Sequence, residues 1–228
     1  MEILYSDNKI IVAVKPRGVL STDEPGGMPG LLRGELGDGT AAVYTVHRLD
    51  AAVGGLMVFA RTRHAASDLG KAVRDGHFHK EYLAVLHGKP EPPVDTISDW
   101  LLRDRYRRVT FVADGPGEDA REARLSFAVI GSSEDLSLVW IELHTGRTHQ
   151  IRVQFASRGF PLWGDRKYGR PGDTGPLALW SCALGFDHPA SGERMHFSLE
   201  PPREYPWTLF VGEGNDGDQT HDALLPGT

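Results

Sequence analysis

Three short segments place polar side chains where a packed core would favour apolar ones, and they are the first candidates for chemistry. Residues 47–50 read His-Arg-Leu-Asp, residues 80–82 read Lys-Glu-Tyr, and residues 144–152 read His-Thr-Gly-Arg-Thr-His-Gln-Ile-Arg. The carboxylate of Asp50 stands out, because such a group can act as a nucleophile or as a general base. A lone aspartate after a strand is more often a turn or cap residue, so its neighbours must support a catalytic reading.

Other kinds of chemistry find little support. Among the ten histidines, His77 and His79 lie two positions apart and His144 and His149 five apart, without a carboxylate or cysteine at familiar metal-site spacing. The single cysteine, Cys182, excludes an internal disulfide and a cysteine-based zinc site. The sequence has no Gly-x-Ser-x-Gly elbow and no phosphate-cradling loop. We therefore expect neither a metal nor a cofactor.

The elements that must position these segments are mostly short strands. Alternating and β-branched runs predict strands at 9–15, 42–49, 56–60, 80–87, 106–113, 121–130, 135–143, 176–184 and 194–199. Helical spacing predicts helices at 64–75, ended by Gly76, and at 149–158, with Thr148 as N-cap and Gly159 as stop. Residues 21–40 read as a flexible loop. Because the connections are short, we expect an antiparallel meander.

Length and composition predict one large domain over residues 1–211 and an acidic, disordered tail over 212–228. Net charge is −6, and −2 without the four carboxylates of the tail, which argues only mildly against a nucleic-acid partner. No apolar stretch is long enough to span a bilayer, and the first residues lack the features of a signal peptide. We expect a cytoplasmic monomer.

The segments occur together with further motifs in an order that resembles the RluA family of pseudouridine synthases. The resemblance covers roughly residues 1–202. It rests on Lys-Pro-Arg-Gly-Val at 15–19, Val-His-Arg-Leu-Asp at 46–50, Lys-Glu-Tyr at 80–82, the run from Leu143 to Arg152, Gly-Asp-Arg-Lys-Tyr-Gly at 164–169 and His-Pro at 188–189. It implies an α+β fold, in which a mainly antiparallel mixed sheet is flanked by helices and loops around a central active-site cleft.

The resemblance also implies a reaction and roles. Uridines within structured RNA, rRNA or tRNA, would be isomerised to pseudouridine without a cofactor, with Asp50 catalytic, Arg152 as its charge partner and Tyr82 stacking on the flipped base and helping to remove its C5 proton. Whether Asp50 attacks C1′ or acts as a base at C2′ stays open. Candidate substrate-binding residues are Arg48, His47, Lys80, Arg147, Thr148 and Gln150. Candidate RNA-backbone contacts are Arg61, Arg63, Arg103, Arg105, Arg107, Arg108, Arg147 and Arg158, although the arginines of 103–108 could equally be a solvated strand face.

Two departures from the family bear on this interpretation. Where relatives have Thr-Ser-Gly after the aspartate, this chain has Val53-Gly54-Gly55, which removes the hydroxyls from that turn. We also expect no small N-terminal RNA-binding domain of the kind that many relatives carry, so that substrate binding would fall to the catalytic domain and its loops. Two alternative functions are an RNA-binding protein without turnover and a hydrolase that releases free uracil. Lys15 and Pro16 are read as a structural strand exit.

Overall fold

The computed structural model describes residues 1–210, and these form two compact units. The first unit contains residues 1–82, 143–148 and 179–200; among the described residues, the second contains 83–142, 149–178 and 201–210. Strand β5 (His79–His87) therefore begins in the first unit and ends in the second. A single domain over 1–211 stays a prediction, and the predicted tail at 212–228 lies outside the described residues.

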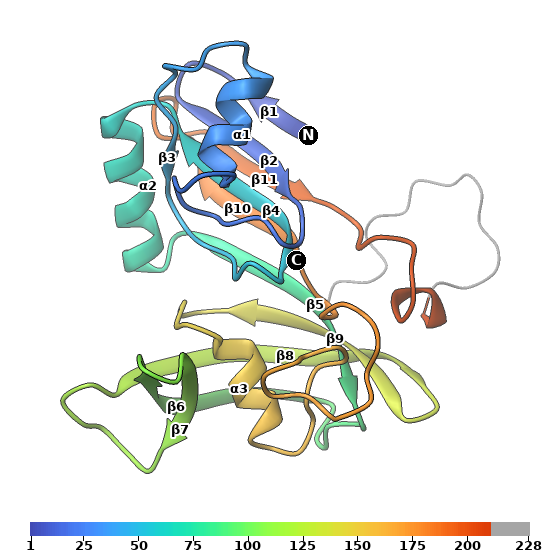
Figure 1. Cartoon of the computed structure of the whole chain (residues 1–228). Helices are drawn as coiled ribbons and strands as arrows, with labels where there is room; N and C mark the ends of the chain where they lie inside the picture. Colours follow the sequence, from blue (N-terminus) through green and yellow to red (C-terminus); the bar gives the residue numbers. More distant parts are fainter. Residues whose placement is uncertain (211–228) are drawn as a thin grey trace. The chain divides into compact units, whose positions relative to one another are not determined.

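The first unit is built on a mixed sheet with the strand order β1-β2-β4-β10, and β11 and β3 pair at β10 and β4 (Figure 1). Its elements are β1 (Ile3–Ser6), β2 (Ile10–Lys15), α1 (Met28–Glu35), β3 (Tyr44–Thr45), β4 (Gly54–Ala60), α2 (Arg63–Asp75), β10 (Leu179–Asp187) and β11 (Arg194–Ser198). Strands β4 and β10 are parallel, whereas the other neighbouring pairs are antiparallel.

The core of this unit forms because alternate residues of the strands face α2. Helix α2 lies against β4 (Figure 1) and buries Ala65 and Leu69 on the apolar stripe that the sequence predicts. The side chain of Thr62 caps its first turn by accepting from the backbone N–H of Ala65, and Gly76 ends it in the left-handed conformation. The stripe meets apolar side chains of β2, β4 and β10, among them Ile10, Val12, Leu56, Val58, Leu184 and Phe186.

Two glycines allow the parallel contact between β4 and β10. A Cβ on Gly55, whose φ is +117°, would lie 2.3 Å from the carbonyl oxygen of Ser181, and one on Gly54 would lie 2.5 Å from the Trp180 ring. Gly54 and Gly55 pair with these two residues in register. The close approach that only glycine permits therefore places β10 beside the strand that follows Asp50.

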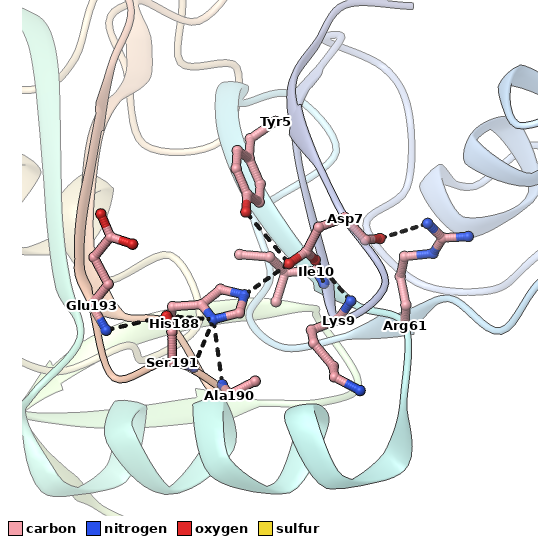
Figure 2. Close-up of polar contacts among 9 residues, drawn as sticks. All are labelled: Tyr5, Asp7, Lys9, Ile10, Arg61, His188, Ala190, Ser191 and Glu193. Atoms are coloured by element: carbon pink, nitrogen blue, oxygen red, sulfur yellow. Dashed lines mark hydrogen bonds and ion pairs between the residues drawn. The ribbon is translucent and has the colours of Figure 1, made fainter.

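A buried histidine ties the turn between β1 and β2 to the turn between β10 and β11 (Figure 2). His188 Nε2 lies 3.0 Å from a carboxylate oxygen of Asp7, and His188 Nδ1 accepts from the backbone N–H of Ser191 at 3.1 Å. The second Asp7 oxygen accepts from the backbone N–H groups of Lys9 and Ile10. This assigns the His-Pro motif at 188–189 a structural role in the first unit.

The second unit contains a strand order β9-β8-β6-β7 with one helix packed on it (Figure 1). Its elements are β6 (Val94–Asp104), β7 (Val109–Ala113), β8 (Arg121–Ser133), β9 (Leu136–Leu143), α3 (Gln150–Ala156) and a short 3-10 helix (Trp207–Leu209). Strand β6 pairs antiparallel with both β7 and β8. Helix α3 packs on β6 and β7, and its Val153 meets Leu101 of β6 and Ala123 of β8.

The structure corrects several of the element predictions. Residues 28–35 form a helix inside the segment read as a loop, because Met28 and Leu32 are buried and Pro29 stands in its first turn. The strand expected at 42–49 is reduced to Tyr44–Thr45, and β1 and β6 were not predicted. The strand expected at 106–113 starts at Val109, because residues 105–108 form the turn after β6.

The expected α+β class is confirmed, but the antiparallel meander is wrong, because β4 and β10 are parallel and far apart in sequence. The N-cap of α3 is His149 in the left-handed conformation, without a side-chain cap, rather than Thr148. Of the helices within residues 1–210, none has the length and apolar character needed to cross a membrane.

Candidate functional site

The turn that carries Asp50 is fixed from both sides by backbone-directed bonds. Ser21 Oγ donates to the carbonyl of Leu49 at 2.7 Å and accepts from the Leu49 N–H at 3.0 Å. Directly after Asp50, the carbonyl of Ala51 accepts from Lys15 Nζ at 3.1 Å and from the N–H of Gly18 at 2.7 Å. The half-buried Asp50 side chain thus stands on a backbone that is held in place before and after it.

His47 anchors the start of the same segment. Its Nε2 accepts from the backbone N–H of Val58 in β4 at 3.1 Å, and its ring packs against Phe78. Burial, and secondarily the charge of Lys80, lowers the pKa of His47 to about 3, so the imidazole is neutral at physiological pH. Because Nε2 accepts a hydrogen bond, the proton sits on Nδ1, which has no partner among the described residues.

Lys15 places a cation beside this turn. Its side chain is fully buried, and Nζ also donates to the carbonyl of Pro16 at 2.9 Å. Burial lowers the pKa of Lys15 to about 8, while the charge of Asp50 acts in the opposite direction. The lysine at the end of β2 therefore supports the chain around Asp50 electrostatically as well as by hydrogen bonds, which extends the structural strand exit that the sequence suggested.

Tyr82, in the part of β5 that belongs to the first unit, is buried, and its phenol interacts electrostatically with the Asp50 carboxylate. Burial, then the charge of Asp50 and that of Cys182, raises the pKa of the Tyr82 phenol well above its usual value. The phenol consequently stays protonated at every physiological pH. A flat, uncharged ring near Asp50 suits stacking on a base better than it suits proton abstraction by a phenolate.

The remaining first-unit candidates differ in exposure. Lys80 is buried, and its pKa is lowered by burial and then by the charge of Arg147. Arg48 and Arg147 are exposed, whereas Thr148 is half-buried. The guanidinium groups of Arg48 and Arg147 can therefore reach an external anion, while Lys80 supplies a fixed positive charge near the backbone of residues 146 and 147.

In the second unit, Arg152 forms a two-pronged ion pair with Asp165. Arg152 Nε donates to Asp165 Oδ2 and the terminal nitrogen Nη2 donates to Oδ1, each at 2.7 Å. The Asp165 side chain has 0% exposure. Asp165 also accepts from the backbone N–H groups of Lys167 and Tyr168. Burial acts to raise the pKa of Asp165, but the bonds and charge of Arg152 and the two N–H groups outweigh it, and the pKa is lowered.

Tyr168 completes this arrangement. Its ring lies 5.2 Å from the Arg152 guanidinium carbon, which adds a cation–π contact. Its hydroxyl accepts from the backbone N–H of Thr110 in β7 at 2.7 Å and lies 2.7 Å from Nδ1 of His149. Asp165 and Tyr168 together thus fix the direction in which Arg152 presents its guanidinium group.

Gln150 is buried at the start of α3, and its side-chain amide donates to the carbonyl of Arg124 at 3.1 Å. This bond gives it a structural partner within the second unit. Its substrate-binding role, like those of the other candidates, stays a prediction.

The predicted residues therefore fall into two groups. The first unit brings together Asp50, Tyr82, Lys80 and His47, and the second unit holds Arg152 and Gln150. The pairing of Arg152 with Asp50 stays a prediction. Sequence reasoning did not assign roles to Asp165 and Tyr168, although both stand in the motif at 164–169. Within residues 1–210, no three His, Cys, Asp or Glu side chains gather as a metal site would require.

Comparison with known proteins gives a consistent result. The model of a family described as RNA pseudouridylate synthase matches residues 9–157. The uncharacterized RNA pseudouridine synthase YlyB of Bacillus subtilis is 34% identical over 215 residues, covering 90% of this chain and 70% of that protein. The ribosomal large subunit pseudouridine synthase D of Zymomonas mobilis is 32% identical over 228 residues, covering 90% and 70% respectively.

Among solved structures, human RNA pseudouridylate synthase domain containing 4 superimposes with a TM-score of 0.75 at 22% identity, over 91% of each chain. At this identity the similarity establishes the fold.

Proposed function

This chain belongs to the RNA pseudouridylate synthase family, and on that premise we propose that it isomerises specific uridines of rRNA or tRNA with Asp50 as the catalytic carboxylate. The sequence resemblance to the RluA family agrees with this membership. The observation that supports the assignment most is the construction around Asp50: Ser21 and Lys15 hold the backbone on either side of a half-buried carboxylate, and Tyr82 feels its charge.

The reaction breaks the bond between uracil N1 and ribose C1′ and forms a bond between C5 and the same C1′. The C5 proton is released and N1 takes up a proton, so the composition is unchanged. Asp50 can begin it by attacking C1′, which gives a covalent sugar ester, or by removing a proton at C2′, which gives a glycal. Both routes need an ionised carboxylate. Lys15 Nζ, which donates to the Ala51 carbonyl directly after Asp50, supplies a positive charge beside the turn, and Arg152 is proposed as the charge partner of the carboxylate.

The other side chains are proposed to hold the everted nucleotide. The uncharged ring of Tyr82 stacks on uracil, a contact worth about 1–3 kcal/mol. The exposed Arg48 and Arg147 contact phosphate or fill the space that the base leaves, and Lys80 supplies a nearby positive charge, while His47 acts by fixing the Arg48–Asp50 segment. Thr148, shortly before α3, and Gln150, the first residue of α3, are proposed to contribute further substrate contacts.

Of the two substrate classes, rRNA is supported by the name of the relative from Zymomonas mobilis, which refers to the ribosomal large subunit. The proposal includes action as a cytoplasmic monomer without a cofactor. Mapping pseudouridines in rRNA and tRNA from cells with and without the gene tests it: at least one position is expected to revert to uridine in cells without it. An unchanged map, together with release of free uracil from RNA by the purified protein, would contradict the proposal and favour a hydrolase.

A further inference from the structure

The turn between β6 and β7 concentrates positive charge on a chain that is acidic overall. Residues 103–108 read Arg-Asp-Arg-Tyr-Arg-Arg, which is four arginines against one aspartate, while the whole chain carries a net charge of −6. All four arginines are exposed. Within residues 1–210, the guanidinium groups of Arg105 and Arg108 make no hydrogen bond or ion pair, so they are available to anions in solution.

An aromatic side chain projects from the same turn. Tyr106 is 96% exposed, and Phe111 on β7, 44% exposed, is a second exposed aromatic residue of the hairpin. A tyrosine with almost its whole ring in water gains nothing for the fold, because it buries no apolar surface. A ring flanked by guanidinium groups is the combination that binds unstacked bases and the phosphates beside them.

The backbone of this turn is held firmly although its side chains are exposed. The Asp104 carboxylate accepts from the Arg107 N–H at 2.8 Å, and Lys167 Nζ donates to the carbonyl of Arg108 at 2.6 Å. Two residues further on, the N–H of Thr110 donates to the hydroxyl of Tyr168. The turn therefore presents its arginines and Tyr106 from a fixed position.

The same anchor also fixes Arg152. Lys167 and Tyr168 donate their backbone N–H groups to Asp165, which grips Arg152, and the Tyr168 ring lies beneath its guanidinium. The exposed turn at 103–108 and the buried Arg152 are thus both held by one short segment of the second unit, residues 165–168. The position of the turn relative to Arg152 is therefore fixed by this segment.

From this we infer that residues 103–108 form an RNA-docking turn, in which the arginines contact the phosphates of a single-stranded flank of the target and Tyr106 stacks on one of its unpaired bases. The inference rests on the proposed function for its substrate, and it supplies the affinity that an acidic chain otherwise lacks. Phosphate contact and stacking act before the chemical step, so the turn contributes to KM rather than to kcat.

Binding of a fluorescein-labelled single-stranded oligouridylate, followed by anisotropy across a salt series, tests the docking turn. Tyr106→Ala is expected to weaken binding about tenfold, and Tyr106→Phe to restore it, because stacking needs only the ring. Arg105→Ser with Arg108→Ser is expected to reduce the slope of log K against log salt by about 1.4, since each lost phosphate contact on a single strand contributes about 0.7.

The matched control is Lys71→Ser with Arg74→Ser, which removes two exposed charges from α2 in the first unit. It changes net charge equally, so it is expected to leave the slope near the wild-type value. Equal effects of both double variants would overturn the docking turn and leave only a general charge effect. Wild-type affinity of Tyr106→Ala would overturn it as well.

Tritium release from C5-labelled RNA separates this inference from the proposed function. In Tyr106→Ala, KM is expected to rise about tenfold with kcat unchanged. Absence of release by the wild-type protein would refute the enzyme assignment, while loss of oligouridylate binding in Tyr106→Ala would still support the turn as an RNA surface. A fall in kcat without a change in KM would contradict docking.

Discussion

Replacing Asp165 by asparagine tests whether the pair with Arg152 is a buried ionic anchor. The substitution keeps the shape of the side chain but removes its charge and turns one of its two acceptor oxygens into a donor. Four donors currently point at this carboxylate: two nitrogens of Arg152 and the N–H groups of Lys167 and Tyr168. In the variant at least one of them faces an NH₂ group, and Arg152 remains charged in a buried place.

The expected cost follows from burial. The Asp165 side chain has 0% exposure and that of Arg152 has 9%, so little water can replace the lost partner. Removing one member of a buried ion pair costs about 3–5 kcal/mol. Asp165→Asn is therefore expected to lower the free energy of unfolding by roughly 3 kcal/mol. An exposed pair of the same geometry would change it by about 1 kcal/mol or less.

The second unit itself offers a less buried pair. Arg158 binds Asp99 with one terminal nitrogen at 2.9 and the other at 3.0 Å, and the side chains are 36% and 11% exposed. Asp99 also accepts from Gln154 Nε2, so Asp99→Asn is expected to cost less than Asp165→Asn but more than the loss of a fully exposed pair. Urea unfolding of Asp165→Asn and Asp99→Asn, monitored by tryptophan fluorescence, compares the two. Four of the five tryptophans, Trp100, Trp140, Trp163 and Trp207, lie in the second unit, so the signal reports mainly on it.

The pH dependence gives a second readout. Because the pKa of Asp165 is lowered below its usual 3.8 in the folded protein, its stabilising contribution is present above that pH and is lost as the pH falls through the folded-state pKa. Asp165→Asn should lack this loss. A stability change no larger than that of Asp99→Asn, with the same acid response as the wild type, would refute the reasoning.

Three further predictions concern the first unit. Gly55→Ala should lower the melting temperature by the equivalent of about 3 kcal/mol, because its Cβ would lie 2.3 Å from the carbonyl oxygen of Ser181. The control Gly76→Ala, also at positive φ but with open space around the new Cβ, should cost about 1 kcal/mol. Similar costs for the two variants would argue against the close contact between the strands. Burial lowers the pKa of Lys15 to about 8, so the free energy of unfolding should rise between pH 8 and 10.5, where the unfolded chain binds more protons than the folded one. In Lys15→Met this rise, measured by urea titration, should vanish. If the rise persists in the variant, a group other than Lys15 causes it. At Asp7, burial acts to raise the pKa, but the backbone N–H groups of Ile10 and Lys9 and then His188 lower it, so the stability that this carboxylate contributes should disappear as the pH falls below 3.8. Asp7→Asn should have a lower melting temperature than the wild type at pH 6 and should lose less stability on acidification. An acid response identical to that of the wild type would contradict this.

The sequence allowed good prediction where local periodicity decides structure. Helix α2 was predicted almost to the residue, because its apolar stripe, its terminal Gly76 and its length agree with one another. Helix α1 was missed because only two of its residues, Met28 and Leu32, supply an apolar face within a Gly- and Pro-rich segment. Its helical state depends on tertiary burial, which a local pattern does not report.

The pairing of strands that are distant in sequence could not be predicted either, because a local pattern does not report tertiary contacts. The parallel contact of β4 with β10 joins residues more than a hundred positions apart and depends on Gly54 and Gly55. The family motif predicted Asp50 as the centre of the site, yet the roles of Lys15, Ser21 and Asp165 appear only when their hydrogen bonds are seen. Such supporting residues have no spacing signal, because the groups that they hold are mostly backbone atoms or side chains brought near by the fold.

The central claim is that the Asp50 carboxylate begins the isomerisation, and tritium release from RNA with C5-labelled uridines measures this directly. Wild-type protein is expected to release tritium, whereas Asp50→Asn, with wild-type melting and RNA binding, should retain less than about 1% of the rate, a barrier increase of about 2.7 kcal/mol or more. Release by Asp50→Asn at a rate close to that of the wild type would contradict the account.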